Sequence, residues 1–178
     1  MKNLLVIVLL ISAFAVQAAD KPAVEKPGKP KLKDKPKIEE TRELLAEHET
    51  IAKLSKIEAR KCMGLTSMCP DNCGHSGDFA SFDIVTYIRY KKPGEYGDDK
   101  SKNYMFQVED NKKNLKISKE LAETVRALQP GDQVILNWRH DYVTRIEGGG
   151  SSKFPDRPIT KLQKITQEEA DKLTKEAK

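Results

Sequence analysis

The chain has 178 residues, of which 33% are charged and 38% hydrophobic, and its formal net charge is +5. Because domains typically hold about 100–150 residues, this length fits one small domain with extensions and excludes large barrels and multidomain enzymes. The excess positive charge lies near the N-terminus, since residues 20–38 contain seven lysines against three acidic residues and residues 39–178 are balanced. A neutral body lacks the basic surface of a nucleic-acid-binding domain, so no nucleic-acid partner is expected.

Residues 1–19 have the pattern of a secretory signal peptide. Lys2 supplies the positive start, and residues 4–16 are almost entirely apolar. The triplets Val16-Gln17-Ala18 and Gln17-Ala18-Ala19 then offer small residues at the spacing that a signal peptidase reads. The apolar run is shorter than the roughly 20 residues that span a bilayer, which favours cleavage over membrane anchoring. The sequence therefore predicts a periplasmic or secreted protein with no transmembrane anchor after cleavage.

A linker and then a helix are predicted to follow the signal peptide. Residues 20–38 combine seven lysines with four prolines and few apolar residues, so they are expected to form a disordered linker. This linker is either a spacer or a cationic arm that touches anionic envelope polymers or lipid head groups. Residues 39–61 are predicted to form a long amphipathic helix, with five residues on one face at helical spacing: Leu44, Leu45, His48, Ile51 and Ala52.

The centre of the chain alternates apolar and polar residues, which predicts strands. Five strands are expected, at Ser81–Lys91, Tyr104–Glu109, Leu115–Ile117, Asp132–His140 and Ile159–Ile165. A short helix capped by Ser118 separates the third strand from the fourth. Residues 148–152 are expected to form a flexible loop, and Thr166 with Glu169 forms a capping box that opens a helix over 166–178.

This order of three strands, a helix and two strands resembles the OB-fold, a partly open five-stranded Greek-key barrel. The resemblance covers residues 79–165. The predicted fold class is therefore α+β, mostly β, with a small five-stranded OB-like barrel preceded by a long amphipathic helix. OB-folds often bind oligonucleotides or oligosaccharides, although a fold does not define a function.

Residues 62–78 form a Cys-rich loop that contains all three cysteines of the chain. In an oxidising compartment two of the three pair, Cys62 with either Cys69 or Cys73, and one thiol is left over. A second interpretation is a metal site, because three thiolates and the imidazole of His75 suit tetrahedral zinc. His140 is an alternative distant ligand. A third interpretation is thiol–redox chemistry at Cys69 or Cys73.

Copper is a second candidate metal for this loop. Met63 and Met68 lie beside Cys62 and Cys69, and soft sulfur ligands suit Cu(I). The string Cys-Pro-Asp-x-Cys at residues 69–73 is similar to the copper-binding loop of the copper chaperones that serve cytochrome oxidase assembly. That resemblance covers five residues and departs from the family's pattern at Gly74, where the chaperones continue with Cys-Pro.

No other segment has a convergent set of acid and base residues, so the chain is expected to be non-enzymatic. Arg139-His140-Asp141-Tyr142 is interpreted as a polar network at the barrel rim. We expect an envelope binding or interaction protein with a disulfide-stabilised loop, and the alternative is a zinc, copper or thiol–redox protein. The expected partner is an envelope component or a glycan. A glycan would contact exposed aromatic residues, and the candidates are Tyr87, Tyr90, Tyr96 and Trp138. Trp138 shares the apolar face of its strand, which is more typical of a core residue.

Overall fold

The computed structural model describes residues 38–64 and 66–177. The predicted signal peptide and, apart from Ile38, the predicted linker lie outside these residues. Six strands and two helices follow in chain order: β1 (Glu39–Arg60), β2 (Gly77–Lys91), β3 (Asn103–Asp110), α1 (Lys119–Ala127), β4 (Gln133–Glu147), β5 (Gly150–Asp156), β6 (Ile159–Ile165) and α2 (Gln167–Glu176). The prediction of a mostly β fold is confirmed. In the described residues, neither helix is long and apolar enough to cross a membrane.

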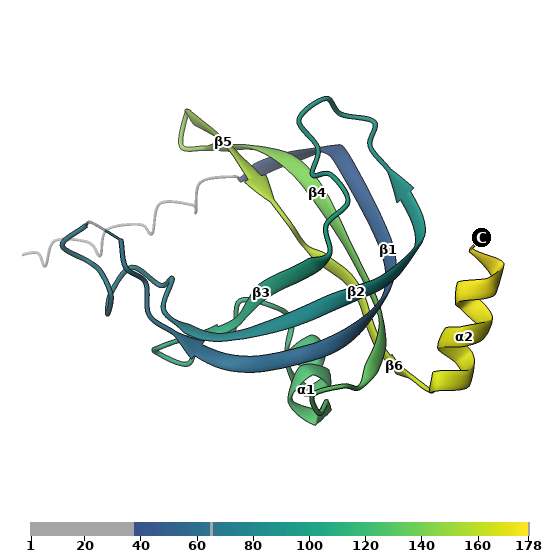
Figure 1. Cartoon of the computed structure of the whole chain (residues 1–178). Coiled ribbons are helices and arrows are strands. Elements are labelled where there is room, and N and C mark those ends of the chain that lie inside the picture. The colour runs from purple at the N-terminus through teal and green to yellow at the C-terminus, as the bar shows by residue number, and fades with distance from the viewer. Residues whose placement is uncertain (1–37, 65, 178) are drawn as a thin grey trace, which may run out of the picture. The chain divides into compact units, whose positions relative to one another are not determined.

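All six strands belong to one antiparallel sheet, which curves strongly but does not close (Figure 1). The order is β3-β2-β1-β4-β5, and β6 also pairs with β4. Because β1 occupies one edge of β4, β5 and β6 share the opposite edge: β6 pairs along Gln133–Trp138 and β5 along Asp141–Glu147. The two short strands are thus successive halves of one sheet edge, divided at Arg157 and Pro158.

The predicted N-terminal helix is wrong, because Glu39–Arg60 is the long central strand of the sheet. The strand pairs with β4 through Glu39–Lys53 and with β2 through Glu47–Arg60. Its Glu, Leu, Ala and Lys residues are good helix formers, but ladders to two neighbours override a weak intrinsic preference.

The helical pattern in β1 arises from register shifts and from burial on both faces. The register with β4 shifts between Leu44 and Ala46, so Leu45 adds a residue to the strand and interrupts the alternation. Further along, Thr50, Ile51 and Ala52 are all buried, because Thr50 and Ala52 lie on the core side and Ile51 packs beneath α2. Buried residues at 45, 46, 48, 50–52 and 54 therefore imitate the three- and four-residue spacing of a helix.

The five-stranded barrel is also not observed. The predicted strand at Leu115–Ile117 contributes one isolated bridge, between Glu109 and Leu115. The predicted flexible loop at 148–152 is a tight β4–β5 hairpin, in which Gly148 and Gly149 both have positive φ angles of 58° and 84°. Glycine adopts this conformation without steric cost, as the two-residue hairpin turn requires.

The main core lies on the concave side of the sheet. Its largest fully buried side chains are Trp138, Phe82, Leu54 and Leu136, and α1 adds Ala122 and Val125. A smaller cluster on the outer side joins α2 to the sheet through Ile51, Ile165 and Ala170. The Ser118 side chain caps α1, and Thr166 with Glu169 forms the capping box of α2 that the sequence pattern predicts.

Candidate metal centre

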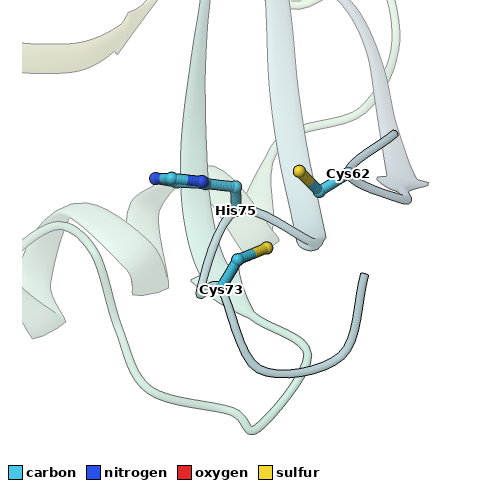
Figure 2. Close-up of side chains that lie close together, drawn as sticks. All are labelled: Cys62, Cys73 and His75. Carbon is cyan, nitrogen blue, oxygen red and sulfur yellow. The ribbon is translucent and has the colours of Figure 1, made fainter. Parts of the chain in front are cut away.

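The segment that joins β1 to β2, residues 61–76, is called the Cys loop below. It brings donor atoms of Cys62, Cys73 and His75 within 4.8 Å of one another. Figure 2 shows that these side chains come from the two ends of the loop: Cys62 follows β1, and Cys73 and His75 precede β2. In this view the imidazole of His75 extends away from the two sulfurs, so joint ligation requires rotation of this exposed side chain.

Cys69 adds a third sulfur to the group. Its Sγ lies 3.5 Å from Sγ of Cys62 and 3.2 Å from the hydroxyl of Thr66. The hydrogen bond from Thr66 and then the neighbouring thiols of Cys62 and Cys73 lower the pKa of Cys69. Hydrogen bonds to a sulfur favour its thiolate form, which is the form that binds metals.

Gly64 supports the Cys62 sulfur. The Gly64 amide donates a hydrogen bond to Sγ of Cys62 at 3.4 Å, which lowers the pKa of Cys62. Hydrogen bonds with Cys69 and Cys73 raise the pKa of Cys62, and the net shift is upward. A side chain at Gly64 would collide with both sulfurs, since a Cβ there would lie 2.9 Å from Sγ of Cys69 and 3.3 Å from Sγ of Cys62. The sequence interpretation missed this residue, although the spacing Cys-x-Gly was available as a signal.

Both ends of the Cys loop are tied to the folded body through Ser76. The Ser76 hydroxyl accepts a hydrogen bond from the Cys62 amide at 3.0 Å and donates one to the Pro70 carbonyl at 2.6 Å. Gln107 of β3 donates through Nε2 to the carbonyls of Gly74 and Ser76 at 3.1 and 3.0 Å. The loop is therefore placed by specific contacts that a core-based sequence argument does not detect.

The turn after β3 makes a second set of contacts with the Cys loop. The Asn111 side chain donates to the Asp71 carbonyl at 3.0 Å, and the Lys112 ammonium group donates to Oδ1 of Asn72 at 2.8 Å. The loop returns to the sheet at Gly77, where φ is 146° and a Cβ would lie 2.1 Å from the Glu109 carbonyl oxygen. Such a close approach of β2 to β3 requires glycine.

His140, the alternative fourth ligand, lies in β4 and is not in the described group of Cys62, Cys73 and His75. Its Nδ1 accepts a hydrogen bond from the Asp98 amide at 3.1 Å, and the Asp98 carboxylate lies at the same distance. The Asp98 carboxylate in turn receives two hydrogen bonds from Arg157, at 2.7 and 2.8 Å. His140 is thus part of a polar network with Asp98 and Arg157.

The aromatic residues considered for glycan binding have different environments. Trp138 is buried and stacks with Tyr104 at 4.1 Å between ring centroids, so it belongs to the core. The Lys100 ammonium group covers the rings of Tyr87 and Tyr90 at 5.2 and 5.4 Å. Tyr96 is 79% exposed. These residues do not form one open aromatic platform.

A pocket of about 320 Å³ lies beside the Cys loop, between the end of β1 and the turn after β3. Its polar lining carries both signs of charge, from Arg60, Lys113, Asp78 and Asp110. None of the three cysteines and neither His75 nor His140 lines this pocket, so it is separate from the candidate metal centre.

Comparison of the chain with protein-family models, with curated proteins and with solved structures gives no match. A function is therefore inferred from the geometry of the Cys loop and from the sequence pattern.

Proposed function

We propose that this chain is a secreted or periplasmic envelope protein that binds one thiophilic metal ion, zinc(II) or copper(I), in the Cys loop. One observation carries the proposal: Cys62, Cys73 and His75 place their donor atoms within 4.8 Å of one another, and the Cys69 sulfur lies 3.5 Å from that of Cys62. Three thiolates and an imidazole are a recurrent ligand set of tetrahedral zinc sites.

The distances favour a metal site over a single structural disulfide as the reason for this cluster. Around tetrahedral zinc, donor atoms are separated by about 3.5–3.8 Å, because Zn–S bonds are about 2.3 Å and Zn–N bonds about 2.0–2.1 Å long. A disulfide needs two sulfurs at about 2.05 Å and accounts for two of the four groups. It gives no reason for the third thiol and the imidazole to gather at the same place.

The same ligands also suit copper(I), and the methionines of the loop add to its soft character. Met63 is 88% and Met68 55% exposed, so their thioethers are accessible beside Cys62 and Cys69. Thiolate and thioether ligands select Cu(I), whereas imidazole with three thiolates is typical of zinc. Dependence on His75 therefore distinguishes the two metals.

The finer fold class is part of the proposal. We interpret the sheet as an open variant of the OB-like arrangement, in which the last strand is divided into β5 and β6. The strand order, with β1 between β2 and β4 and a helix between β3 and β4, supports this interpretation. The envelope location rests on residues 1–19, and N-terminal sequencing of exported protein that starts at Asp20 would support it.

The test is metal binding by the reduced protein. We expect one zinc per chain after gel filtration, and a cobalt(II) derivative with thiolate-to-metal charge-transfer absorption. Cys62→Ser, Cys69→Ser and Cys73→Ser should each weaken binding by more than about tenfold, because even the loss of a group that only supports a ligand typically costs about 10–100-fold. A reduced, folded protein that binds neither zinc nor copper(I) would refute the proposal.

Two histidine variants form a matched pair for the same experiment. His75→Gln should weaken zinc binding but change copper(I) binding little if copper is held by thiolates alone. His140→Gln serves as the control, because His140 lies in β4 and contacts Asp98, not the Cys loop. Loss of metal from His140→Gln with intact thermal unfolding would assign the distant histidine instead.

A further inference from the structure

We infer that the Cys loop also performs thiol–disulfide exchange: an external disulfide oxidises Cys62 and Cys69 to an intramolecular disulfide, and the metal ion is released. This inference rests on the proposed metal site. It deepens that proposal by naming the class of co-reactant, a disulfide, and the two sulfurs that react with it.

The choice of sulfur pair follows from the distances. Sγ of Cys62 and Sγ of Cys69 are 3.5 Å apart, and a disulfide of about 2.05 Å requires an approach of about 1.5 Å. The Cys73 thiol also neighbours both sulfurs, but it donates a hydrogen bond to the Pro70 carbonyl at 3.7 Å. In this inference Cys73 is the thiol that is left over.

The surroundings allow the two sulfurs to approach without disturbing the sheet. Both cysteines are partly exposed and lie between β1 and β2, outside the strands. The backbone on either side is held by local hydrogen bonds, from the Cys62 amide to Ser76 and from the Cys69 amide to the Thr66 carbonyl. Rotation of the two side chains can supply much of the approach, and the loop can supply the rest.

The chemistry balances with a disulfide RSSR as the oxidant. One thiolate of the pair attacks a sulfur of RSSR, which forms a mixed disulfide and expels RS⁻. The second thiolate attacks the protein sulfur of that mixed disulfide, which forms the Cys62–Cys69 bond and expels a second RS⁻. The pair has lost two electrons, and RSSR has gained them as two thiolates.

Release of the metal follows from the loss of ligands. A disulfide sulfur is not a thiolate and binds zinc poorly, so Cys73 and His75 are the donors that remain. Structural zinc sites in proteins have four ligands, and two are insufficient to retain the ion against solvent.

The test treats reduced protein carrying one zinc with glutathione disulfide. Zinc release is followed with a chromogenic chelator, and free thiols are then alkylated. Trypsin with Asp-N separates residues 62–70 from residues 71–77, so Cys62 and Cys69 lie in one peptide and Cys73 in the other. We expect peptide 62–70 to be unalkylated and lighter by two hydrogen atoms, peptide 71–77 to be alkylated, and both changes to keep pace with zinc release.

Other pairings overturn the inference. A disulfide that joins peptide 71–77 to peptide 62–70 would show that Cys73 reacts. If all three cysteines of the folded protein are still alkylated after treatment, while an unfolded control is fully oxidised, the pair does not react in the folded protein. Complete Cys62–Cys69 oxidation with zinc still bound would refute the coupling.

Two variants separate this inference from the metal proposal. Cys73→Ser should lose zinc but form the Cys62–Cys69 disulfide at a rate within about twofold of the metal-free protein. Cys62→Ser should stop at a mixed disulfide between glutathione and Cys69. If the protein binds no zinc at all, the peptide masses of the metal-free protein still decide whether the pair undergoes exchange.

Discussion

The imidazole of His48 lies flat against the indole of Trp138, with ring centroids 4.4 Å apart and ring planes 6° from parallel. His48 is fully buried, and neither of its ring nitrogens has a hydrogen-bond partner among the described residues. Burial lowers the pKa of His48, the Asp98 carboxylate opposes this shift, and His140 adds to it. The neutral imidazole therefore serves as a flat packing surface in the core.

This stacking predicts that acid destabilises the protein through His48. The folded-state pKa is lowered, so the unfolded chain binds more protons as the pH falls below about 6.5, the ordinary pKa of histidine. The free energy of unfolding should decrease from about pH 7 towards pH 5 and level off below the folded-state pKa. His48→Phe retains a ring in the core and should show a shallower decrease in urea unfolding experiments. Parallel pH profiles for the two proteins would contradict this role.

The central position of β1 predicts where amide hydrogens exchange most slowly. Residues 47–53 pair with both β2 and β4, whereas 39–43 pair with β4 and 56–60 with β2. Exchange at 47–53 therefore requires opening of the sheet on both sides and should approach the rate set by global unfolding. Hydrogen-exchange mass spectrometry measures this, and equal protection at 47–53 and at the strand ends would contradict it.

The sequence predicted the fold where alternation was undisturbed. Ser81–Lys91 and Tyr104–Glu109 were recognised as strands because each has one buried face with a period of two residues. β1 was not recognised as a strand, because the register shift near Leu45 and the outer packing of Ile51 bury residues on both of its faces. Such features depend on β4 and α2, which are far away in the chain, so no local pattern contains them.

The site was predictable in its residue types but not in its arrangement. Three cysteines and His75 within residues 62–75 indicated thiolate chemistry, and the same spacing left disulfide and metal interpretations open. The supporting groups Gly64 and Gln107 were missed. Gln107 belongs to β3, and its contact with the Cys loop depends on the pairing of β2 with β3.

The two hydrogen bonds from Gln107 predict that this side chain supports metal binding. Gln107→Ala removes the donors to the Gly74 and Ser76 carbonyls and frees the end of the loop that carries Cys73 and His75. Zinc affinity should fall about tenfold, a typical effect of losing a supporting contact. The free energy of unfolding should fall by about 1–2 kcal/mol. The control is Gln163→Ala on the exposed face of β6, and equal zinc affinities for the two variants would contradict the prediction.

The contact between Gly64 and the two sulfurs predicts a selective effect of one methyl group. In Gly64→Ala the new Cβ would lie 2.9 Å from Sγ of Cys69 and 3.3 Å from Sγ of Cys62, so at least one sulfur must move away. Zinc affinity, measured by competition with a chelator, should therefore fall by about tenfold or more. The free energy of unfolding should change by no more than about 0.5 kcal/mol, because the affected atoms lie outside the sheet.

Met63→Ala is the matched control for Gly64→Ala, since it changes the neighbouring residue of the same loop at a side chain that is 88% exposed. It should leave zinc affinity unchanged, and a decrease in copper(I) affinity would indicate that the Met63 thioether contributes to a copper site. Wild-type zinc affinity in Gly64→Ala would mean that Cys62 and Cys69 do not bind the ion from the positions that they occupy beside Gly64. The metal would then have to be held by Cys73 and His75 with other groups, and the reactive pair would be independent of the metal site.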